Sequence, residues 1–265
     1  MNKLRFKYSM KIIYSSLVDS CHFTIKCLPA NTDRQEIEEI NIEINPEAKY
    51  SYSEDGFGNK KLIGSTSGQH ERFCLLITGC VKIKQIMYES VYRDENIGIY
   101  KYPYGKTIPG KKLINYTNML CSEMLNRRIS NAYDKAIFIM RRLNKDFDYF
   151  PEVTNVETTA EEAFAIGKGV CQDYAHIYIA ILRQIKVPAR YVAGLMIGEG
   201  KSHAWVELLL RKKWIGFDPT NCLTVDDNYI KLAHGRDAGD CKINLGIIRG
   251  GGSQIQGIDV KVWKE

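Results

Sequence analysis

The sequence of 265 residues has no long hydrophobic run. Its first residues, MNKLRFKYSMKIIYSS, mix charged and apolar side chains, unlike a signal peptide or a membrane span. No later segment stays apolar over the length that a bilayer requires. These absences predict no membrane association. Because nothing in the sequence indicates export, we expect a cytoplasmic location.

Cysteine pairs of the C-x-x-C type are also absent, although the chain has eight cysteines. Cys21 and Cys27 lie in one strand-like run, and Cys74 and Cys80 lie in another. Six residues along a strand span ~20 Å, whereas bridged Cα atoms lie within ~7 Å of each other. We therefore expect no disulfide, and most of the thiols should be small buried hydrophobic groups.

The basic residues are not concentrated in one place. The net charge is +6 and the isoelectric point is about 8.8, but the cations occur in small clusters such as Lys60-Lys61 and Arg211-Lys212-Lys213. A nucleic-acid-binding surface usually shows a dense stripe of Arg and Lys with aromatic residues between them. We therefore expect no nucleic-acid partner, and no pattern predicts the oligomeric state.

Motifs for metals and phosphate groups are missing as well. The sequence contains no D-x-D-x-D-G loop of the kind that holds calcium. Zinc sites usually have ligands in closely spaced pairs, and no such pair occurs among His203, Cys222, His234 and Cys241. The segment IRGGGSQ is rich in glycine, but no Lys-Ser/Thr helix start follows it, as a phosphate-binding loop requires. The sequence therefore predicts neither a metal nor a cofactor.

The chain changes its pattern along its length. Residues 1–90 contain short runs rich in Ile, Val, Phe and Tyr, separated by turn residues, and we interpret them as an N-terminal β-sandwich. Residues 91–112 include the segment PYGKTIPGKK, whose prolines and glycines indicate a linker. Residues 113–265 combine helical and strand patterns, which predicts a second domain. The expected fold class is α+β.

The second domain begins with helical periodicity. Two apolar stripes predict two helices, the second capped by Ser130 or Asn131, and Thr158 or Thr159 caps a short third helix. The stripes are Leu120, Met124, Leu125 and Ile129, then Ala136, Ile137, Met140 and Leu143. A further helix begins near Cys171. The strands ARYVAGLMI, HAWVELLL and WIGFDPT follow, and GIDVKVW is a closing strand.

Cys171 follows a glycine-containing segment and begins the amphipathic helix CQDYAHIYIAILRQ. A thiol in this position feels the positive end of the helix dipole, which favours the thiolate. A thiolate that does chemistry also needs a base, and the base needs an orienting acceptor. Without such partners, Cys171 would be interpreted as a buried structural thiol.

His203 and Asp218 supply the two missing groups. Alternation along HAWVELLL places His203, Trp205 and Glu207 on one face of a strand, opposite Ala204, Val206 and Leu208. If Arg211 and Lys212 form the turn, Asp218 falls roughly opposite Trp205, on the face that carries His203. Asp218 can then orient the imidazole while the other ring nitrogen faces Cys171.

These motifs resemble those of the transglutaminase-like superfamily, a branch of the papain-like thiol enzymes. The resemblance lies in GKGVCQDYAH, HAWVE and GFDPTN, with GRD at 235–237 and DGFGN at 55–59 in the N-terminal half. It implies a papain-like core with an antiparallel sheet and a helix that carries the cysteine. It also implies a catalytic triad of Cys171, His203 and Asp218.

Three functions remain open at this point. The first is a thiol hydrolase (a cysteine protease or amidase) whose substrate is a protein or peptide and whose thioester intermediate is released by water. The second is a transglutaminase that passes the same acyl group to an amine, and the third is a non-catalytic interaction module. The absence of a calcium loop favours hydrolysis, and the intact triad argues against a module.

Other polar residues near the motifs have structural interpretations. His176 lies five positions after Cys171, which turns it away from the cysteine, so we interpret it as structural. Trp205 and Trp214 are expected to pack in the core. Arg236 and Asp237 are expected to form a buried pair. The helix-start N–H groups, including that of Cys171, can hold an oxyanion, and no residue stands out as the second donor.

Overall fold

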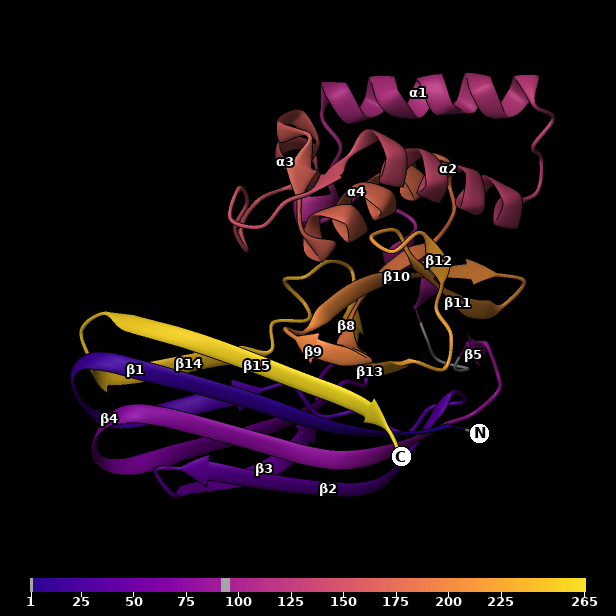
Figure 1. Ribbon diagram of the computed structural model, residues 1–265. Coiled ribbons are helices and arrows are strands. Elements are labelled where there is room, and N and C mark those ends of the chain that lie inside the picture. The colour runs from indigo at the N-terminus through magenta and orange to yellow at the C-terminus, as the bar shows by residue number, and fades with distance from the viewer. Residues whose placement is uncertain (1, 92–95) are drawn as a thin grey trace.

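The computed structural model describes residues 2–91 and 96–265, and it arranges them in three layers (Figure 1). Helices form one outer layer, a sheet of shorter strands lies in the middle, and a sheet of long strands forms the other outer layer. Both sheets are antiparallel, which confirms the expected α+β class. Residues 92–95 of the predicted linker lie outside the described residues.

The long-stranded sheet is a single hydrogen-bonded sheet that folds over on itself. Its described strands are β1 (Asn2–Ile25), β2 (Gln35–Asn45), β3 (Ala48–Glu54), β4 (Lys60–Ile83), β9 (Gly198–Gly200), β14 (Asn244–Gly250) and β15 (Gln254–Lys264). β1 and β4 pair along their whole length, but the register breaks between Ile13 and Ser20. Before this break β1 pairs with β15, and after it β1 pairs with β14.

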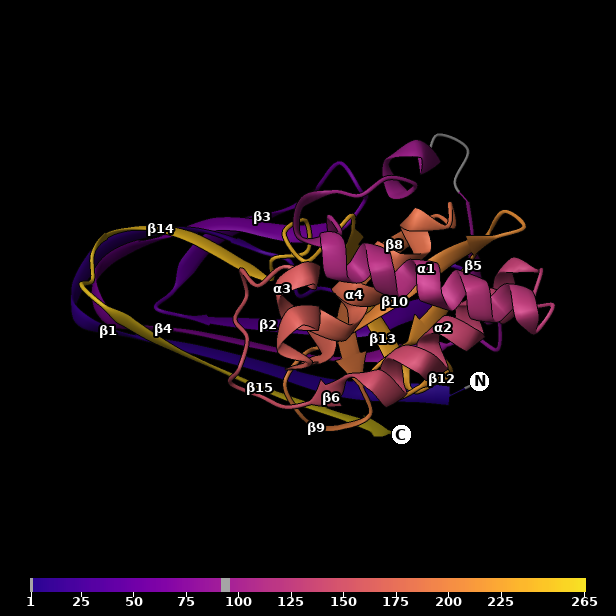
Figure 2. The same cartoon turned by 90° about the horizontal axis from the view of Figure 1, so that it is seen from above.

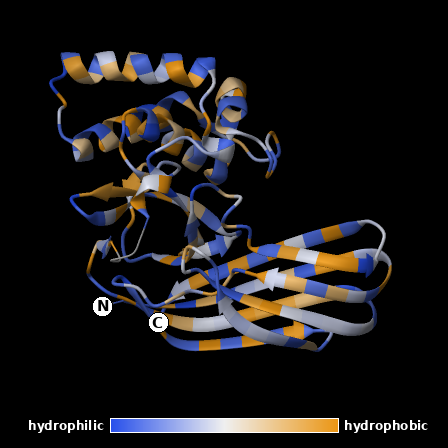
Figure 3. Cartoon of the chain, turned by 180° about the vertical axis from the view of Figure 1, so that it is seen from behind, coloured by the Kyte–Doolittle hydropathy of each residue, from blue (hydrophilic) through white to orange (hydrophobic). Residues whose placement is uncertain are grey.

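The break turns the two halves of the sheet towards each other. Apolar residues at every second position of β1, from Leu4 to Ile12, are buried in one core with Phe23 and Ile25 from the second half. The alternation of apolar and polar residues is visible along the strands (Figure 3). The folded end of this sheet projects beyond the helices (Figure 2). The two halves of the long-stranded sheet therefore share the strands β1 and β4 and are not separate sheets.

The strand pairing crosses the predicted domain limits of 1–90, 91–112 and 113–265. The closing strand predicted over GIDVKVW exists as part of β15, but it completes the sheet that residues 1–90 begin. In the opposite direction, β5 (Tyr88–Ser90) pairs with β11 of the middle sheet. A sequence pattern predicts a strand but not its partner, and this explains the difference.

The middle sheet carries the strands that the motifs predicted. Its described strands are β12 (Leu223–Thr224), β11 (Lys213–Asp218), β10 (His203–Leu210), β8 (Ala189–Met196) and β13 (Tyr229–Gly235) in spatial order, with β5 beside β11. As the alternation of β10 predicted, Ala204, Val206 and Leu208 belong to the core that the sheet shares with the helices. Trp205 lies in a separate cluster with Tyr229.

The helices agree with the predicted caps. α1 spans Lys111–Asn126, α2 spans Ala132–Asp146, α3 spans Ala160–Ile166 and α4 spans Cys171–Gln184. Asn131 caps α2 by accepting a hydrogen bond from the Asp134 N–H, and Thr159 caps α3 in a capping box with Glu162. None of the described helices combines the length and the apolar character needed to cross a membrane.

Two predictions about the first helix were wrong. α1 begins at Lys111, inside the predicted linker, and the short 3-10 helices η1 (Ile97–Tyr100) and η2 (Gly105–Thr107) precede it. Leu125 was expected on the buried stripe, but it is 79% exposed. The buried stripe of α1 consists of Leu113, Thr117, Leu120 and Met124, and Leu125 lies about 100° away from Met124 around the helix axis.

A buried network of polar contacts lies within the middle sheet. Glu89, Arg190, Glu207 and Lys231 form a buried network, in which Lys231 Nζ lies 2.6 Å from Glu89 and 2.8 Å from Glu207. Burial raises the pKa of Glu207, but the charges of Arg190 and Lys231 outweigh it and lower that pKa to about 2. Opposite charges of neighbouring strands thus compensate each other inside the protein.

Asn59 connects the turn at 55–59 with strand β13 of the middle sheet. Its side-chain amide donates to the His234 carbonyl at 2.8 Å and accepts from the His234 N–H at 2.8 Å. Asn59 is 3% exposed, and it belongs to the turn at 55–59 in which the Asp55 carboxylate accepts the N–H groups of Phe57 and Asn59. The turn therefore positions one amide that pairs with the backbone of β13.

We predict that Asn59→Ala lowers the free energy of unfolding by about 1–3 kcal/mol, because the two backbone groups of His234 lose their partner inside the protein. Urea denaturation measures this change. Asn41→Ala is the control, because Asn41 is exposed and donates only to Glu39. Equal midpoints for the two variants would contradict the prediction.

Candidate active site

The first turn of α4 presents Cys171 through a network centred on Asp173. The Asp173 carboxylate accepts the Val170 N–H at 2.8 Å and the Thr154 hydroxyl at 2.6 Å. Burial raises the pKa of Asp173, and these two hydrogen bonds oppose that effect. A Cβ atom at Gly169 would lie 2.4 Å from the same carboxylate, so the chain needs glycine at this position. Cys171 itself is partly exposed.

The rest of α4 is buried, and the buried side chain of Arg183 anchors its C-terminal end. Every residue from Asp173 to Arg183 is buried. The Arg183 guanidinium donates to the Ala189 and Arg236 carbonyls at 2.8 and 2.7 Å and to the Thr107 hydroxyl at 2.7 Å. Burial lowers the pKa of Arg183 to about 10. The helix is therefore anchored at its far end, while its N-terminus stays accessible.

His203 begins β10 and Asp218 ends β11, as the sequence predicted. Val206 pairs with Phe217, and this register brings Asp218 diagonally opposite His203. His203 Nε2 donates a hydrogen bond to Asp218 Oδ2 at 2.7 Å. This contact leaves Nδ1 as the ring nitrogen that can serve Cys171.

The carboxylate of Asp218 is fully buried and accepts several further hydrogen bonds. Oδ2 accepts the Asn221 side-chain amide and the Tyr229 hydroxyl, both at 2.8 Å, and Oδ1 accepts the Thr220 and Asn221 N–H groups at 3.0 and 3.1 Å. Burial raises the pKa of Asp218, but the hydrogen bond from His203 and those from Asn221 and Tyr229 outweigh burial and lower that pKa. Asp218 is therefore a fixed anion.

His203 interacts with both neighbours of the expected triad. Burial lowers its pKa, but hydrogen bonding to Asp218 and to Cys171 outweighs burial, and the charges of both residues add to the effect. The result is a His203 pKa of about 10, so the imidazole is protonated over the neutral range. The structure thus brings together the three residues that the sequence singled out, with His203 interacting with both Asp218 and Cys171.

Sequence reasoning did not identify Tyr229 and Asn221. Tyr229 lies on β13 and donates to Asp218 from a position eleven residues away, and its ring packs against Trp205 at 5.4 Å. The interpretation of Trp205 as a packing residue agrees with its 1% exposure. Asn221 follows directly after the DPT segment, so its local turn could have suggested an Asp218 partner. No sequence signal connects Tyr229 to the site.

The other histidines occupy different places. His176 is fully buried, its Nε2 accepts the Ala238 N–H at 3.1 Å, and burial lowers its pKa to about 3. The structural interpretation of His176 agrees with this position. The His234 ring lies 6.5 Å from that of Phe57, on the side of β13 that Asn59 contacts.

The predicted pair of Arg236 with Asp237 was wrong. Arg236 Nε binds Asp240 Oδ2 at 2.8 Å, four residues further along the chain, and the guanidinium lies over the Tyr104 ring. The Asp237 carboxylate instead accepts the Lys106 and Gly239 N–H groups at 2.9 and 2.8 Å. Both residues lie in the bend after β13, where the backbone directs their side chains to different partners.

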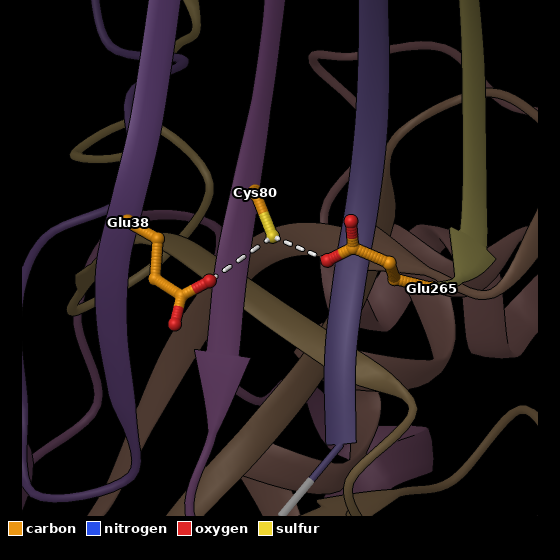
Figure 4. Close-up of side chains that lie close together, drawn as sticks. All are labelled: Glu38, Cys80 and Glu265. Carbon is orange, nitrogen blue, oxygen red and sulfur yellow. Dashed lines mark hydrogen bonds between the residues drawn. The ribbon is translucent and has the colours of Figure 1, made fainter.

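One cluster of three potential metal ligands occurs among the described residues, in the long-stranded sheet (Figure 4). Cys80 Sγ lies 3.6 Å from carboxylate oxygens of both Glu38 and Glu265. Lys3 binds Glu38 at 2.7 Å, and Arg5 binds Glu265 at 2.8 Å. Burial and both carboxylates raise the pKa of Cys80, which disfavours the thiolate that binds metals. These residues therefore form an ion-pair cluster.

Both halves of the chain match known protein families. Residues 123–219 match the transglutaminase-like superfamily, and residues 4–82 match the bacterial transglutaminase-like N-terminal region. The chain belongs to the transglutaminase-like superfamily. The crystal structure of a "Putative Cysteine Protease" from Cytophaga hutchinsonii aligns with a TM-score of 0.79 and 21% identity, covering 100% of this chain and 91% of that one. This similarity is one of fold.

Two mycobacterial relatives of this transglutaminase-like protein are uncharacterized. A protein of Mycobacterium leprae is 32% identical over 151 residues, which cover 52% of this chain and 54% of that protein. A protein of Mycobacterium bovis is 26% identical over 276 residues and covers 93% of this chain and 88% of its own length. The chain therefore matches about half of the first relative and most of the second.

We predict that iodoacetamide labels Cys171 of this transglutaminase-like protein at pH 6 before any other cysteine. The His203 imidazolium stabilises the attacking thiolate, and a hydrogen bond to a charged group contributes about 1.5–3 kcal/mol. His203→Ala should therefore slow labelling about tenfold or more, and Asp218→Ala should slow it less. Peptide mapping of the labelled protein measures both rates. Unchanged labelling of His203→Ala would leave the helix dipole as the cause.

The raised pKa of His203 also predicts how stability depends on pH. A group whose pKa is raised on folding stabilises the protein fully below its ordinary pKa of 6.5, and this contribution disappears as the pH passes about 10. His203→Ala should therefore destabilise the protein more at pH 6 than at pH 10.5, by at least ~1 kcal/mol. Urea titrations at both pH values measure the difference. A pH-independent loss would contradict the assignment.

Proposed function

We propose that this protein is a thiol-dependent hydrolase of amide or peptide bonds that uses Cys171, His203 and Asp218. The observation that carries the proposal is the 2.7 Å hydrogen bond between Asp218 and His203 Nε2, together with the interaction of the same imidazole with Cys171. A nucleophile, a base and an orienting anion in this order form the arrangement that thiol catalysis needs.

In the proposed acylation, the Cys171 sulfur attacks the substrate carbonyl carbon and the π electron pair moves to oxygen. The N-terminus of α4 faces the developing negative charge, because first-turn N–H groups have no partner within the helix. When the C=O bond re-forms, the C–N bond breaks and the leaving amine takes a proton from the His203 imidazolium. A thioester on Cys171 remains.

In the proposed deacylation, neutral His203 takes a proton from water, and the hydroxide oxygen adds to the thioester carbonyl. The C–S bond then breaks, the acid leaves, and the thiolate–imidazolium pair of the protein is regenerated. Asp218 stays ionised through both steps, because its hydrogen bonds hold its pKa low. Its role is to orient the imidazole and to stabilise the imidazolium.

The expected substrate is a protein or peptide, and the description of the Cytophaga protein as a cysteine protease supports this class. Asn221 and Tyr229 act as positioning residues for Asp218 in this proposal, because the side chains of both donate hydrogen bonds to its carboxylate. A cytoplasmic location is also part of the proposal. It is supported by the eight cysteines, which are all free.

We predict that the protein cleaves casein and that a primary amine in the mixture is not incorporated. Mass spectrometry of casein incubated with the protein, with and without the amine, distinguishes new fragments from amine adducts. Cys171→Ser should lose activity by at least ~10³-fold, since the triad acts as a unit. Cys74→Ser, which changes a partly buried thiol outside the site, is the matched control.

Amine adducts without fragments would replace the hydrolase by an acyltransferase that uses the same thioester. Neither product from a protein whose Cys171 still reacts with iodoacetamide would favour a non-catalytic module.

A further inference from the structure

A small parallel sheet lies directly beside the nucleophile. β6 (Asp148–Tyr149) pairs with β7 (Lys168–Gly169), and Tyr149 is the register partner of Gly169. The Asp148 N–H binds the Gly167 carbonyl at 3.0 Å, and the Phe150 N–H binds the Gly169 carbonyl at 2.8 Å. Because Gly169 precedes Cys171 by two residues, this sheet fixes the backbone of Tyr149 next to the start of α4.

The neighbours of Tyr149 fix its orientation. Phe147 is buried against Tyr174, with ring centroids 4.8 Å apart, and its carbonyl accepts the Tyr174 hydroxyl. The Phe150 ring lies outside, 5.3 Å from Lys168 Nζ. The segment is therefore tied to α4 on one side and to β7 on the other, which limits the freedom of the residue between them.

The side chain of Tyr149 is accessible to a ligand. The residue is 57% exposed, and its hydroxyl has no hydrogen-bond partner within the described residues. Partial burial raises the pKa of Tyr149, and an electrostatic interaction with Cys171 adds to this effect. The hydroxyl therefore keeps its proton and is available as a donor.

We propose that Tyr149 is a catalytic residue whose hydroxyl donates a hydrogen bond to the substrate carbonyl oxygen as Cys171 attacks. This inference rests on the proposed function and supplies the second donor that the sequence did not reveal. The backbone N–H of Cys171 is the first donor. Both keep their protons, and the negative charge leaves the oxygen when the C=O bond re-forms.

The test compares two reactions of the same thiol. Acylation by p-nitrophenyl acetate passes through an oxyanion, whereas alkylation by iodoacetamide does not. Removing one oxyanion donor costs about 10²-fold or more in rate. Tyr149→Phe should therefore lower kcat/KM for the ester about 100-fold through kcat, with KM and the iodoacetamide rate within about twofold of the wild type. Tyr102→Phe, with 63% exposure in another part of the chain, is the control and should change neither reaction.

Each other outcome overturns the inference. An unchanged ester rate means that the hydroxyl makes no contact in the transition state. An equal loss in both reactions means that Tyr149 acts on the thiol or on the local fold, and a change in KM alone means ground-state binding. Failure of the proposed function is distinct, because it would appear as absent casein cleavage by the wild type while the ester comparison still gives a result.

Discussion

The burial of α4 from Asp173 to Arg183 is the constraint on which the rest of this structure depends. A helix buried over this length can expose reactive atoms only at an end, and its C-terminal end is covered by the segments that Arg183 binds. The N-terminus, where the helix dipole is positive, remains the accessible end. The helices, the middle sheet and the short strand β7 all pack around this one element, and together they determine where Cys171 lies.

Much of the site could be predicted because it is encoded in short local segments. The helix start at Cys171, the alternation of β10 and the turn between β10 and β11 each follow from neighbouring residues, and together they place His203 near Asp218. The caps Asn131 and Thr159 are local in the same sense. In such segments, the sequence determines the structure almost without help from distant parts of the chain.

The features that could not be predicted are contacts between distant segments. Tyr229 reaches Asp218 from another strand, and the backbone of Tyr149 is placed beside the start of α4 by the short pairing of β6 with β7. The assignment of β15 to the long-stranded sheet required knowledge of its partner, since an isolated strand pattern fits either sheet. The exposure of Leu125 shows the same limit within a helix, because the packing partners of α1 decide which of two adjacent apolar residues, Met124 or Leu125, is buried.

The pairing of β9 with β15 affects when the segment before His203 is stabilised during synthesis. β9 ends three residues before His203, and its partners Val260, Lys261 and Val262 are translated about sixty residues later. β15 also covers β1, whose second edge stays unpaired until β15 has been made. Contacts over such separations form slowly. Cys171 and His203 are therefore translated well before the strand that supports β9, and the segment that leads into His203 gains its final support only when the long-stranded sheet is complete.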